Sequence, residues 1–319
     1  MDRRSFLMAS AGLTALGASA AETGLFKGPL KIVVPAPAGA APDILSRKIG
    51  DQLARVIGQP VVVDNKVGAR GAIGMGEAAR ARPDGQTLVM GYASAFCIEP
   101  ALNSKFGFDP VRDFSAVALV ATLSPAIVVR GGLPIKTMAE FIDYARKNPE
   151  KLNVGTSTST NILLAAMLEQ AAGIKLYKVP YASSGDARVD LLAGRIDVFF
   201  DPPASVVQYI KAGSIRAIAV FDPQRNHAIA EVPTVAETGF PSLTFVGWNG
   251  LLGPKGMPDA AIQLLNREVR KIMSTPEMKP VLESLGVNAG DVSAAEFGQL
   301  ISTSVTRFTE VAERTGIRM

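Results

Sequence analysis

The residues best suited to bind a small molecule lie in two loops, each between an expected strand and an expected helix. The first loop runs from Pro35 to Asp43 and holds only Pro, Ala and Gly before the aspartate. The second, residues 156–161, carries five hydroxyl side chains followed by Asn161. Such loops can direct backbone N–H groups, hydroxyls and the positive end of a helix toward a small anion. A closely packed turn is the alternative for the first loop, and simple helix capping for the second.

The sequence gives little support for a catalytic function. Its one histidine, His227, lies in a polar stretch expected at the surface, and its one cysteine, Cys97, is flanked by apolar residues that suggest burial. No His and Cys spacing suits zinc, and neither a nucleophile elbow nor a glycine-rich phosphate loop with Gly-Lys-Ser/Thr occurs. We therefore expect no enzymatic activity, no metal, no cofactor and no disulfide.

Two aspartates need separate consideration because they could form a catalytic carboxylate pair. Asp43 is better explained as a cap of the first helix or as the partner of Arg47, one turn further on. Asp201 precedes two prolines, so it could order a turn or face a cleft, and the sequence favours neither.

The spacing of apolar residues predicts strands and helices that position these loops. Since strands alternate with helices, parallel sheets covered on both faces are expected, with ligands at the carboxyl ends of the strands. This places residues 91–94 beside the first loop. Strands are expected at 31–34, 61–63, 87–90, 117–123, 126–129, 152–155, 196–200, 215–220 and 245–248. Helices are expected at 43–57, 137–147, 162–172, 259–274, 276–285 and 294–314.

Length and composition favour two folded domains. The chain has 319 residues, of which 48% are hydrophobic and 19% charged, and its net charge of +4 is spread without basic runs. Nucleic-acid binding is therefore not expected. Arg3 and Arg4 precede an apolar run that ends at Ala18-Ser19-Ala20, which indicates a signal peptide cleaved near Ala20/Ala21 and a periplasmic location. A twin-arginine signal is favoured, with a general secretory signal as the alternative.

Several stretches, taken in order, resemble one family over essentially the whole mature length. The chain is similar to the extracytoplasmic solute receptors of tripartite tricarboxylate transporters, the Bug family. The stretches are 33–43 with Ser46-Arg47, 64–76, 83–85 with Thr87-Leu88, 109–114, 152–161, 179–181, 194–199 with Asp201, and 232–239.

This resemblance implies an α/β, type II periplasmic-binding-protein fold. Two α/β lobes are joined by two crossing strands, with the ligand cleft between them. Residues 1–21 would be the signal peptide, 22–123 and 246–319 the first lobe, and 124–245 the second. In the family the first loop usually reads Phe-Pro-Pro-Gly-Gly, where this chain has 36–40, Ala-Pro-Ala-Gly-Ala. The second loop usually carries glycines and a histidine, where this chain has Thr158, Thr160 and Leu164.

The function implied is that of a periplasmic receptor that passes a small carboxylate-bearing organic acid to the membrane subunits of a transporter. A monomer is expected. A sensor that signals to a membrane partner is the alternative, followed by an exported enzyme on the same fold. The expected ligand-binding residues are Ala38, Gly39, Ala40, Ala41, Asp43, Tyr92, Ser94, Thr156, Ser157, Thr158, Ser159, Thr160, Asn161, Tyr181, Ser184 and Asp201.

Overall fold

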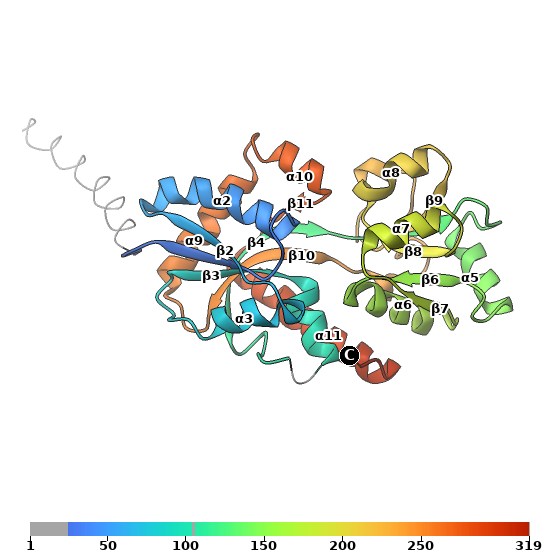
Figure 1. Cartoon of the computed structure of the whole chain (residues 1–319), viewed down its shortest axis with the longest axis horizontal. Coiled ribbons are helices and arrows are strands. Elements are labelled where there is room, and N and C mark those ends of the chain that lie inside the picture. Colours follow the sequence, from blue (N-terminus) through green and yellow to red (C-terminus); the bar gives the residue numbers. More distant parts are fainter. Residues whose placement is uncertain (1–24, 104–105, 319) are drawn as a thin grey trace, which may run out of the picture.

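The computed structural model describes residues 25–103 and 106–318, so the predicted signal peptide lies outside the described residues. The described chain forms two lobes side by side, each built around its own sheet (Figure 1). The strands are β1 (Leu30–Val34), β2 (Val61–Asn65), β3 (Thr87–Tyr92), β4 (Phe114–Leu123), β5 (Ala126–Arg130), β6 (Asn153–Thr156), β7 (Tyr177–Pro180), β8 (Val198–Asp201), β9 (Ile215–Val220), β10 (Gly247–Pro254) and β11 (Asn288–Ala289).

Helices connect these strands. The α-helices are α2 (Ala41–Ile57), α3 (Ala72–Ala79), α4 (Glu99–Leu102), α5 (Met138–Lys147), α6 (Ser159–Ala172), α7 (Ser184–Leu192), α8 (Pro203–Lys211), α9 (Asp259–Met273), α10 (Lys279–Leu285) and α11 (Ala294–Thr315). Short helical turns are η1 (Ala69–Gly71), η2 (Ser94–Ile98), η3 (His227–Ile229) and η4 (Pro241–Leu243).

Both sheets are mixed, which corrects the expectation of parallel sheets. In the first lobe the strand order is β11-β4-β10-β3-β1-β2, and β1 runs parallel to β2 and β3. In the second lobe the order is β7-β6-β8-β5-β9, and β6 runs parallel to β7 and β8. However, β10 is antiparallel to β3 and β4, and β5 is antiparallel to β8 and β9. The parallel pattern fails at these strands because each enters its sheet from the other lobe.

Two segments cross between the lobes. β4 ends at Leu123 and β5 begins at Ala126, so two residues separate strands of different sheets. The return segment reaches β10 at Gly247, which pairs with Leu123. The two crossings therefore lie side by side in the middle of the molecule (Figure 1).

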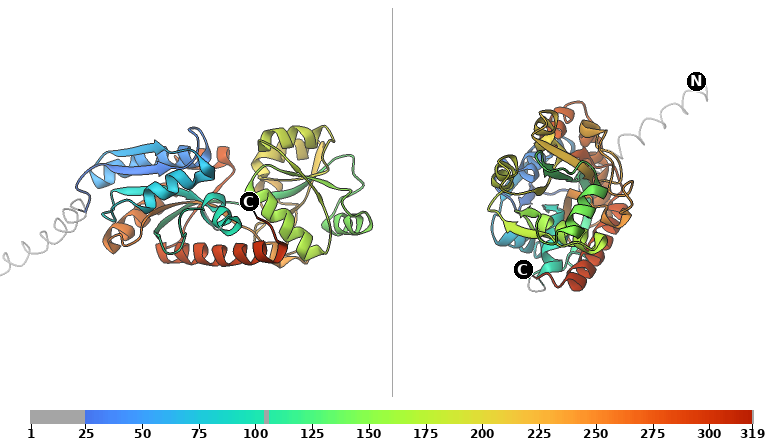
Figure 2. Two further views of the ribbon diagram at one scale, coloured as in Figure 1. Left: turned by 60° about the horizontal axis from the view of Figure 1, so that its bottom comes forward. Right: turned by 90° about the vertical axis from the view of Figure 1, so that its right-hand side faces the viewer.

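Apolar packing holds the helices against both sheets and also joins the lobes. Leu45 and Ile49 of α2 and Leu265 of α9 belong to one core cluster of the first lobe. Helix α11 runs along the first lobe and its end reaches the second (Figure 2). There Phe308 of α11 and Leu164 of α6 belong to a single cluster of buried residues. The lobes thus share a core on the α11 side.

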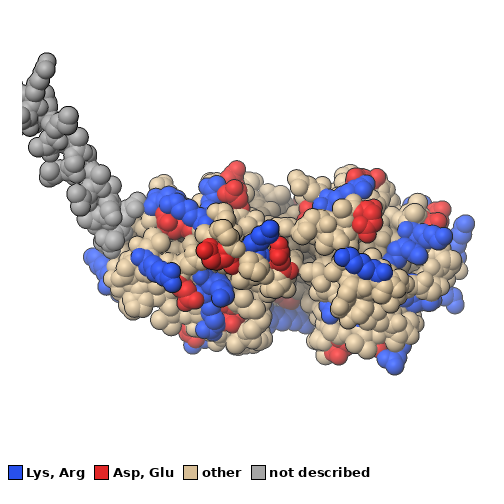
Figure 3. Space-filling view, turned by 90° about the horizontal axis from the view of Figure 1, so that it is seen from above, with Lys and Arg blue, Asp and Glu red and all other residues tan. Residues whose placement is uncertain are grey.

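Charges of both signs are mixed on one face of the molecule, and the described helices include no candidate membrane span. On the face shown in Figure 3, Lys and Arg are interspersed with Asp and Glu. No helix in residues 25–103 and 106–318 is long and apolar enough to cross a membrane. Within the same ranges no cluster of His, Cys, Asp and Glu is arranged to hold a metal ion.

Candidate functional site

A cavity of about 420 Å³ lies between the two lobes, beside the crossing segments. Its volume falls in the range of roughly 300–1,000 Å³ that is usual for small-molecule sites. The starts of α2 and α6 border it from opposite lobes. It is lined by Ala36, Ala40, Ala41, Pro42, Tyr92, Ala93, Ser94, Leu123, Pro125, Thr158, Thr160, Asn161, Ser184, Phe200, Asp201, Pro202, Phe245, Gly247, Trp248 and Asn249.

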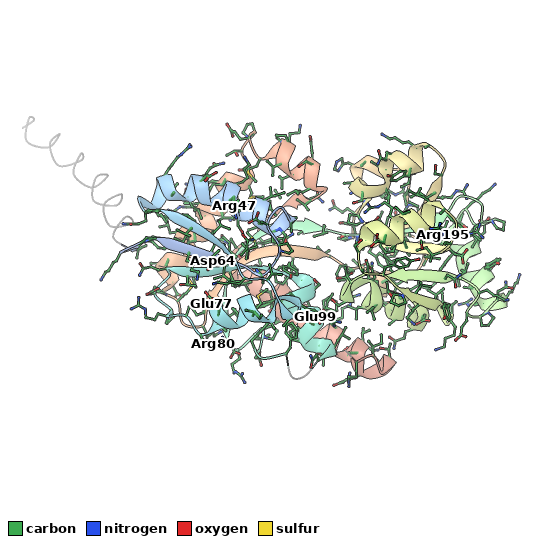
Figure 4. The ribbon with its side chains drawn as sticks, viewed as in Figure 1. Arg47, Asp64, Glu77, Arg80, Glu99 and Arg195 are labelled. Carbon is green, nitrogen blue, oxygen red and sulfur yellow. The ribbon has the colours of Figure 1, made fainter. Side chains whose placement is uncertain are left out.

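The first loop is held together by Asp43, whose side chain is buried and does not line the cavity. Its Oδ2 accepts the backbone N–H of Gly39 at 2.9 Å, and its Oδ1 accepts hydrogen bonds from Arg47 Nε and Asn65 Nδ2, both at 3.0 Å. Although burial raises the pKa of Asp43, these three donors together hold it below its ordinary value. Asp43 therefore pairs with Arg47, as the sequence indicated, and it orders the loop. Figure 4 shows where Arg47 lies in the first lobe.

Gly39 does not offer the donor that the sequence suggested. Its N–H is already given to Asp43, and its φ of 82° lies in the left-handed region that favours glycine. A proline at this position would be strained, because proline requires a φ near −65°. The N–H of Ala41, by contrast, donates to no acceptor in the described residues, and Ala41 lines the cavity.

Most polar groups of the second loop bond to one another. Thr158 is the N-cap of α6 and accepts the Asn161 N–H at 3.2 Å. The Oδ1 of Asn161 accepts from Thr158 Oγ1 at 3.0 Å and from the Ser157 hydroxyl at 3.0 Å, and its Nδ2 donates to the Phe200 carbonyl at 2.9 Å. Thr160 makes no such side-chain bond within the described chain, and its backbone N–H at the second position of α6 is also uncommitted. Thr160 can therefore donate to a ligand with both its backbone N–H and its hydroxyl.

The remaining polar walls come from β3, α7 and β8. Tyr92 donates its hydroxyl to the Pro35 carbonyl at 3.0 Å, and burial raises its pKa to about 12, so it stays protonated. Ser184 contacts Ser157 through their hydroxyl oxygens at 2.9 Å. These contacts tie the walls to the two principal loops.

Asp201 is the only charged side chain that lines the cavity in the described chain, and it is 1% exposed. Arg188 of α7 donates to its two oxygens, from Nε at 2.7 Å and from Nη2 at 3.2 Å. Burial raises the pKa of Asp201, and the Arg188 pair opposes that shift. Asp201 therefore faces the cleft, but as part of an ion pair.

The structure brings nine of the sixteen expected residues to the cavity and leaves seven outside its lining. Tyr181 does not line the cavity; its hydroxyl donates to Asp190, which in turn pairs with Arg195. Thr156 Oγ1 donates to the Val179 carbonyl instead. The nine lining residues are Ala40, Ala41, Tyr92, Ser94, Thr158, Thr160, Asn161, Ser184 and Asp201. The seven others are Ala38, Gly39, Asp43, Thr156, Ser157, Ser159 and Tyr181.

Sequence reasoning missed the apolar wall of the cavity. Leu123, Phe245 and Trp248 belong to the crossing segments or adjoin them. The sequence could have pointed to these residues, because the two crossings were expected near residues 123 and 246, beside the cleft. Trp248 is 1% exposed, and its indole N–H has no partner in the described residues. Leu164, by contrast, lies in the core and does not line the cavity.

Two α/β lobes around an interlobe cavity define a solute-binding protein of the periplasmic type. The family model described as "Tripartite tricarboxylate transporter family receptor" matches residues 45–317. The chain belongs to this family, TctC or Bug, whose members are solute receptors and not enzymes. The predicted family, fold and absence of enzymatic activity are thereby confirmed.

Three solved structures show how widely the fold is shared. One described as a periplasmic transporter is 34% identical, with a TM-score of 0.75 over 92% of this chain and 98% of that one. Rpa4515 of R. palustris, solved with adipate, is 28% identical, with a TM-score of 0.75 over 92% and 98%. MatC of Rhodopseudomonas palustris, solved with malate, is 26% identical, with a TM-score of 0.73 over 90% and 99%.

Proposed function

We propose that this protein captures a small carboxylate-bearing organic acid between its lobes and delivers it to the membrane subunits of a tripartite tricarboxylate-type transporter. One carboxylate lies between the starts of α2 and α6. The observation that carries this proposal is that Ala41 and Thr160 line the cavity with uncommitted backbone N–H groups at two helix starts. Helix N-termini attract anions.

The family and its solved members support the same proposal. Relatives of similar fold were solved with adipate and with malate, both of which carry two carboxylates. The family description names a transporter, which supports delivery over signalling. Export by a signal peptide cleaved near Ala20/Ala21 would place the receptor in the periplasm, and N-terminal sequencing of periplasmic protein tests that step.

The binding step is tested with the purified protein and a panel of mono-, di- and tricarboxylic acids. Trp248 is the only tryptophan and it lines the cavity, so its fluorescence should change on binding. A ligand at 100 times its dissociation constant should stabilise the fold by about 2.7 kcal/mol. Mass spectrometry of what co-purifies identifies the natural ligand. If no acid in the panel binds, the protein is not a carboxylate receptor.

Delivery needs a separate measurement in cells. Cells that lack the protein should fail to take up the labelled ligand, and restoring the gene should restore uptake. Uptake that does not depend on the protein, together with a ligand-dependent change in gene expression, would favour the sensor instead.

A further inference from the structure

Two buried polar side chains that line the cavity lack a hydrogen-bond partner in the described residues. Trp248 is 1% exposed, and its indole N–H has no partner there. Asn249, the next residue of β10, is 4% exposed, and its amide makes no hydrogen bond within the described chain. Buried polar groups are almost always hydrogen-bonded, because an unpaired one has lost its bonds to water. Both groups are therefore open to an acceptor from outside the chain.

The core holds the indole of Trp248 in place. The ring packs edge-on against Phe297 at 5.1 Å between centroids and against Phe96 at 5.8 Å. Because close packing fixes the ring, its N–H has one direction before a ligand arrives. A donor that is already ordered loses little conformational freedom on binding, so it can discriminate sharply between ligands.

These two donors lie apart from the helix starts that hold the first carboxylate. Asn249 pairs with Tyr92 of β3, and in the sheet order β10-β3-β1 two strand spacings separate β10 from β1. The loop after β1 leads to Ala41 at the start of α2. At a usual strand spacing of about 4.8 Å, the separation across the sheet is about 10 Å. The β10 donors therefore face a different part of a bound ligand.

The cavity also holds more donors than one carboxylate can use. Those at helix starts are the Ala41 N–H, the N–H and hydroxyl of Thr160, and the Ser184 N–H at the first position of α7. The Ser94 hydroxyl makes no hydrogen bond within the described residues either. Since a carboxylate accepts about four hydrogen bonds, the helix starts can satisfy one such group by themselves. The two donors on β10 remain for another group of the ligand.

We infer that Trp248 and Asn249 form a specificity-determining subsite, and that the ligand carries a second oxygen-bearing group, remote from its first carboxylate, that accepts hydrogen bonds from them. This inference rests on the proposed receptor function and names the residues that recognise the far end of the ligand. The group is a hydroxyl, a carbonyl or a second carboxylate, since each presents oxygen lone pairs. An acid whose far end is only hydrocarbon leaves buried donors unpaired, and such sites reject analogues that lack the required oxygen.

Isothermal titration calorimetry at pH 7 with acids of one chain length tests the inference. Hexanoate has no oxygen beyond its carboxylate, 6-hydroxyhexanoate has a neutral oxygen at its far end, and adipate has a second carboxylate there. At least one of the last two should bind about fivefold or more tightly than hexanoate. The comparison between them shows whether the subsite takes a neutral or a charged oxygen. Hexanoate binding as tightly as both would overturn the inference and leave the receptor function standing.

Removing each donor gives an independent readout. Trp248→Phe keeps a ring in the wall and removes the N–H, and Asn249→Leu removes the amide at similar volume. Each should weaken binding of the oxygen-bearing acid, and of the tightest acid in the wider panel, by about fivefold or more. Binding of hexanoate should weaken considerably less, whereas a role in packing alone would weaken all acids equally. Because Asn249→Leu breaks no hydrogen bond within the described chain, the melting temperature of its unliganded form should not fall.

Ser124→Ala is the matched control. The Ser124 hydroxyl is also buried without a partner in the described residues, but Ser124 does not line the cavity. Its removal should leave all affinities unchanged. If Trp248→Phe does not fold, Asn249→Leu carries the test. Unchanged relative affinities in the folded variants would show that water and not the ligand satisfies these donors, which contradicts the inference. Failure of every acid to bind the parent protein contradicts the proposed function itself.

Discussion

The starts of α2 and α6 have the same local construction, one in each lobe. The third residue of each helix is Asp43 or Asn161, and its side-chain oxygen accepts the N–H of the residue four positions earlier. The distance from Gly39 N to Asp43 Oδ2 is 2.9 Å, and that from Ser157 N to Asn161 Oδ1 is 3.3 Å. The two loops are therefore folded by equivalent hydrogen bonds.

The two starts differ in charge and in the residue before the third position. Asp43 places a carboxylate at the start of α2, where it offsets the positive helix end, and Pro42 there has no N–H to donate. Asn161 is neutral and gives its amide to the Phe200 carbonyl, and Thr160 keeps an N–H. The first lobe thus offsets the charge of its own helix end and keeps one uncommitted lining N–H, that of Ala41, while the second lobe leaves its helix end uncompensated and offers both an N–H and a hydroxyl from Thr160. We expect α6 to contribute more to carboxylate binding than α2.

The largest effect should follow from making the α6 start resemble the α2 start in charge. Asn161→Asp would replace the amide that donates to Phe200 at 2.9 Å with a second acceptor and place a negative charge beside the ligand carboxylate. We expect the free energy of unfolding to fall by about 2–4 kcal/mol. Affinity for the carboxylate ligand should fall by about 100-fold or more. Urea unfolding and calorimetry measure the two quantities.

The control for this change is Asn161→Leu, which removes the hydrogen bond to Phe200 without adding charge and also removes the oxygen that accepts from Ser157 and Thr158. It should lose at least as much stability and considerably less affinity. Equal affinities of the Asp and Leu variants would show that charge at the α6 start does not matter to the ligand.

An intermediate effect is expected when the second residue of α6 is made to match Pro42. Thr160→Pro removes an N–H and a hydroxyl at a position where helices tolerate proline. Loss of hydrogen bonds to a charged group should weaken binding by about tenfold or more. Thr160→Val keeps the N–H and the side-chain shape, so it should lose less affinity. If both variants bind as tightly as the parent, the carboxylate is held elsewhere.

The smallest effect should come from removing the charge at the α2 start. Asp43→Asn keeps an oxygen for the Gly39 N–H but weakens the charge-assisted bonds, so we expect a loss of about 1 kcal/mol in stability and little change in affinity. The folded-state pKa of Asp43 lies below its ordinary value of 3.8. The stabilisation of the fold by ionised Asp43 is therefore complete above its ordinary pKa. It disappears as the pH falls through the lower folded-state pKa.

The free energy of unfolding, measured between pH 7 and acidic pH, tests this predicted pH dependence. The difference between Asp43→Asn and the parent should be constant near neutrality and shrink toward zero in acid. Asp51→Asn, on the exposed face of the same helix, is the control and should show little difference at any pH. A stability difference for Asp43→Asn that grows on acidification would contradict the assignment of Asp43 as a stabilising carboxylate.

Elements with a clear local pattern could be predicted from the sequence. The helix expected at 137–147 is α5, with Thr137 as its cap in a capping box with Glu140. The crossing strands expected at 117–123 and 126–129 are β4 and β5. The start of α6 was expected at residue 162 but lies at Ser159, because Thr158 and not a later residue is the cap. Spacing and caps are properties of neighbouring residues, and therefore a linear pattern reveals them.

The sequence by itself determined where the two strand–loop–helix units and the two crossings lie, because apolar periodicity and capping act over a few residues. Only the tertiary structure decided which donors remain free and which side chains form the wall. The N–H of Gly39 donates to Asp43, and Asp201 forms an ion pair with Arg188 of another element. Trp248 lines the cavity from a strand far along the chain. Hydrogen bonding and burial depend on which distant segments come into contact, and local sequence patterns do not determine those contacts.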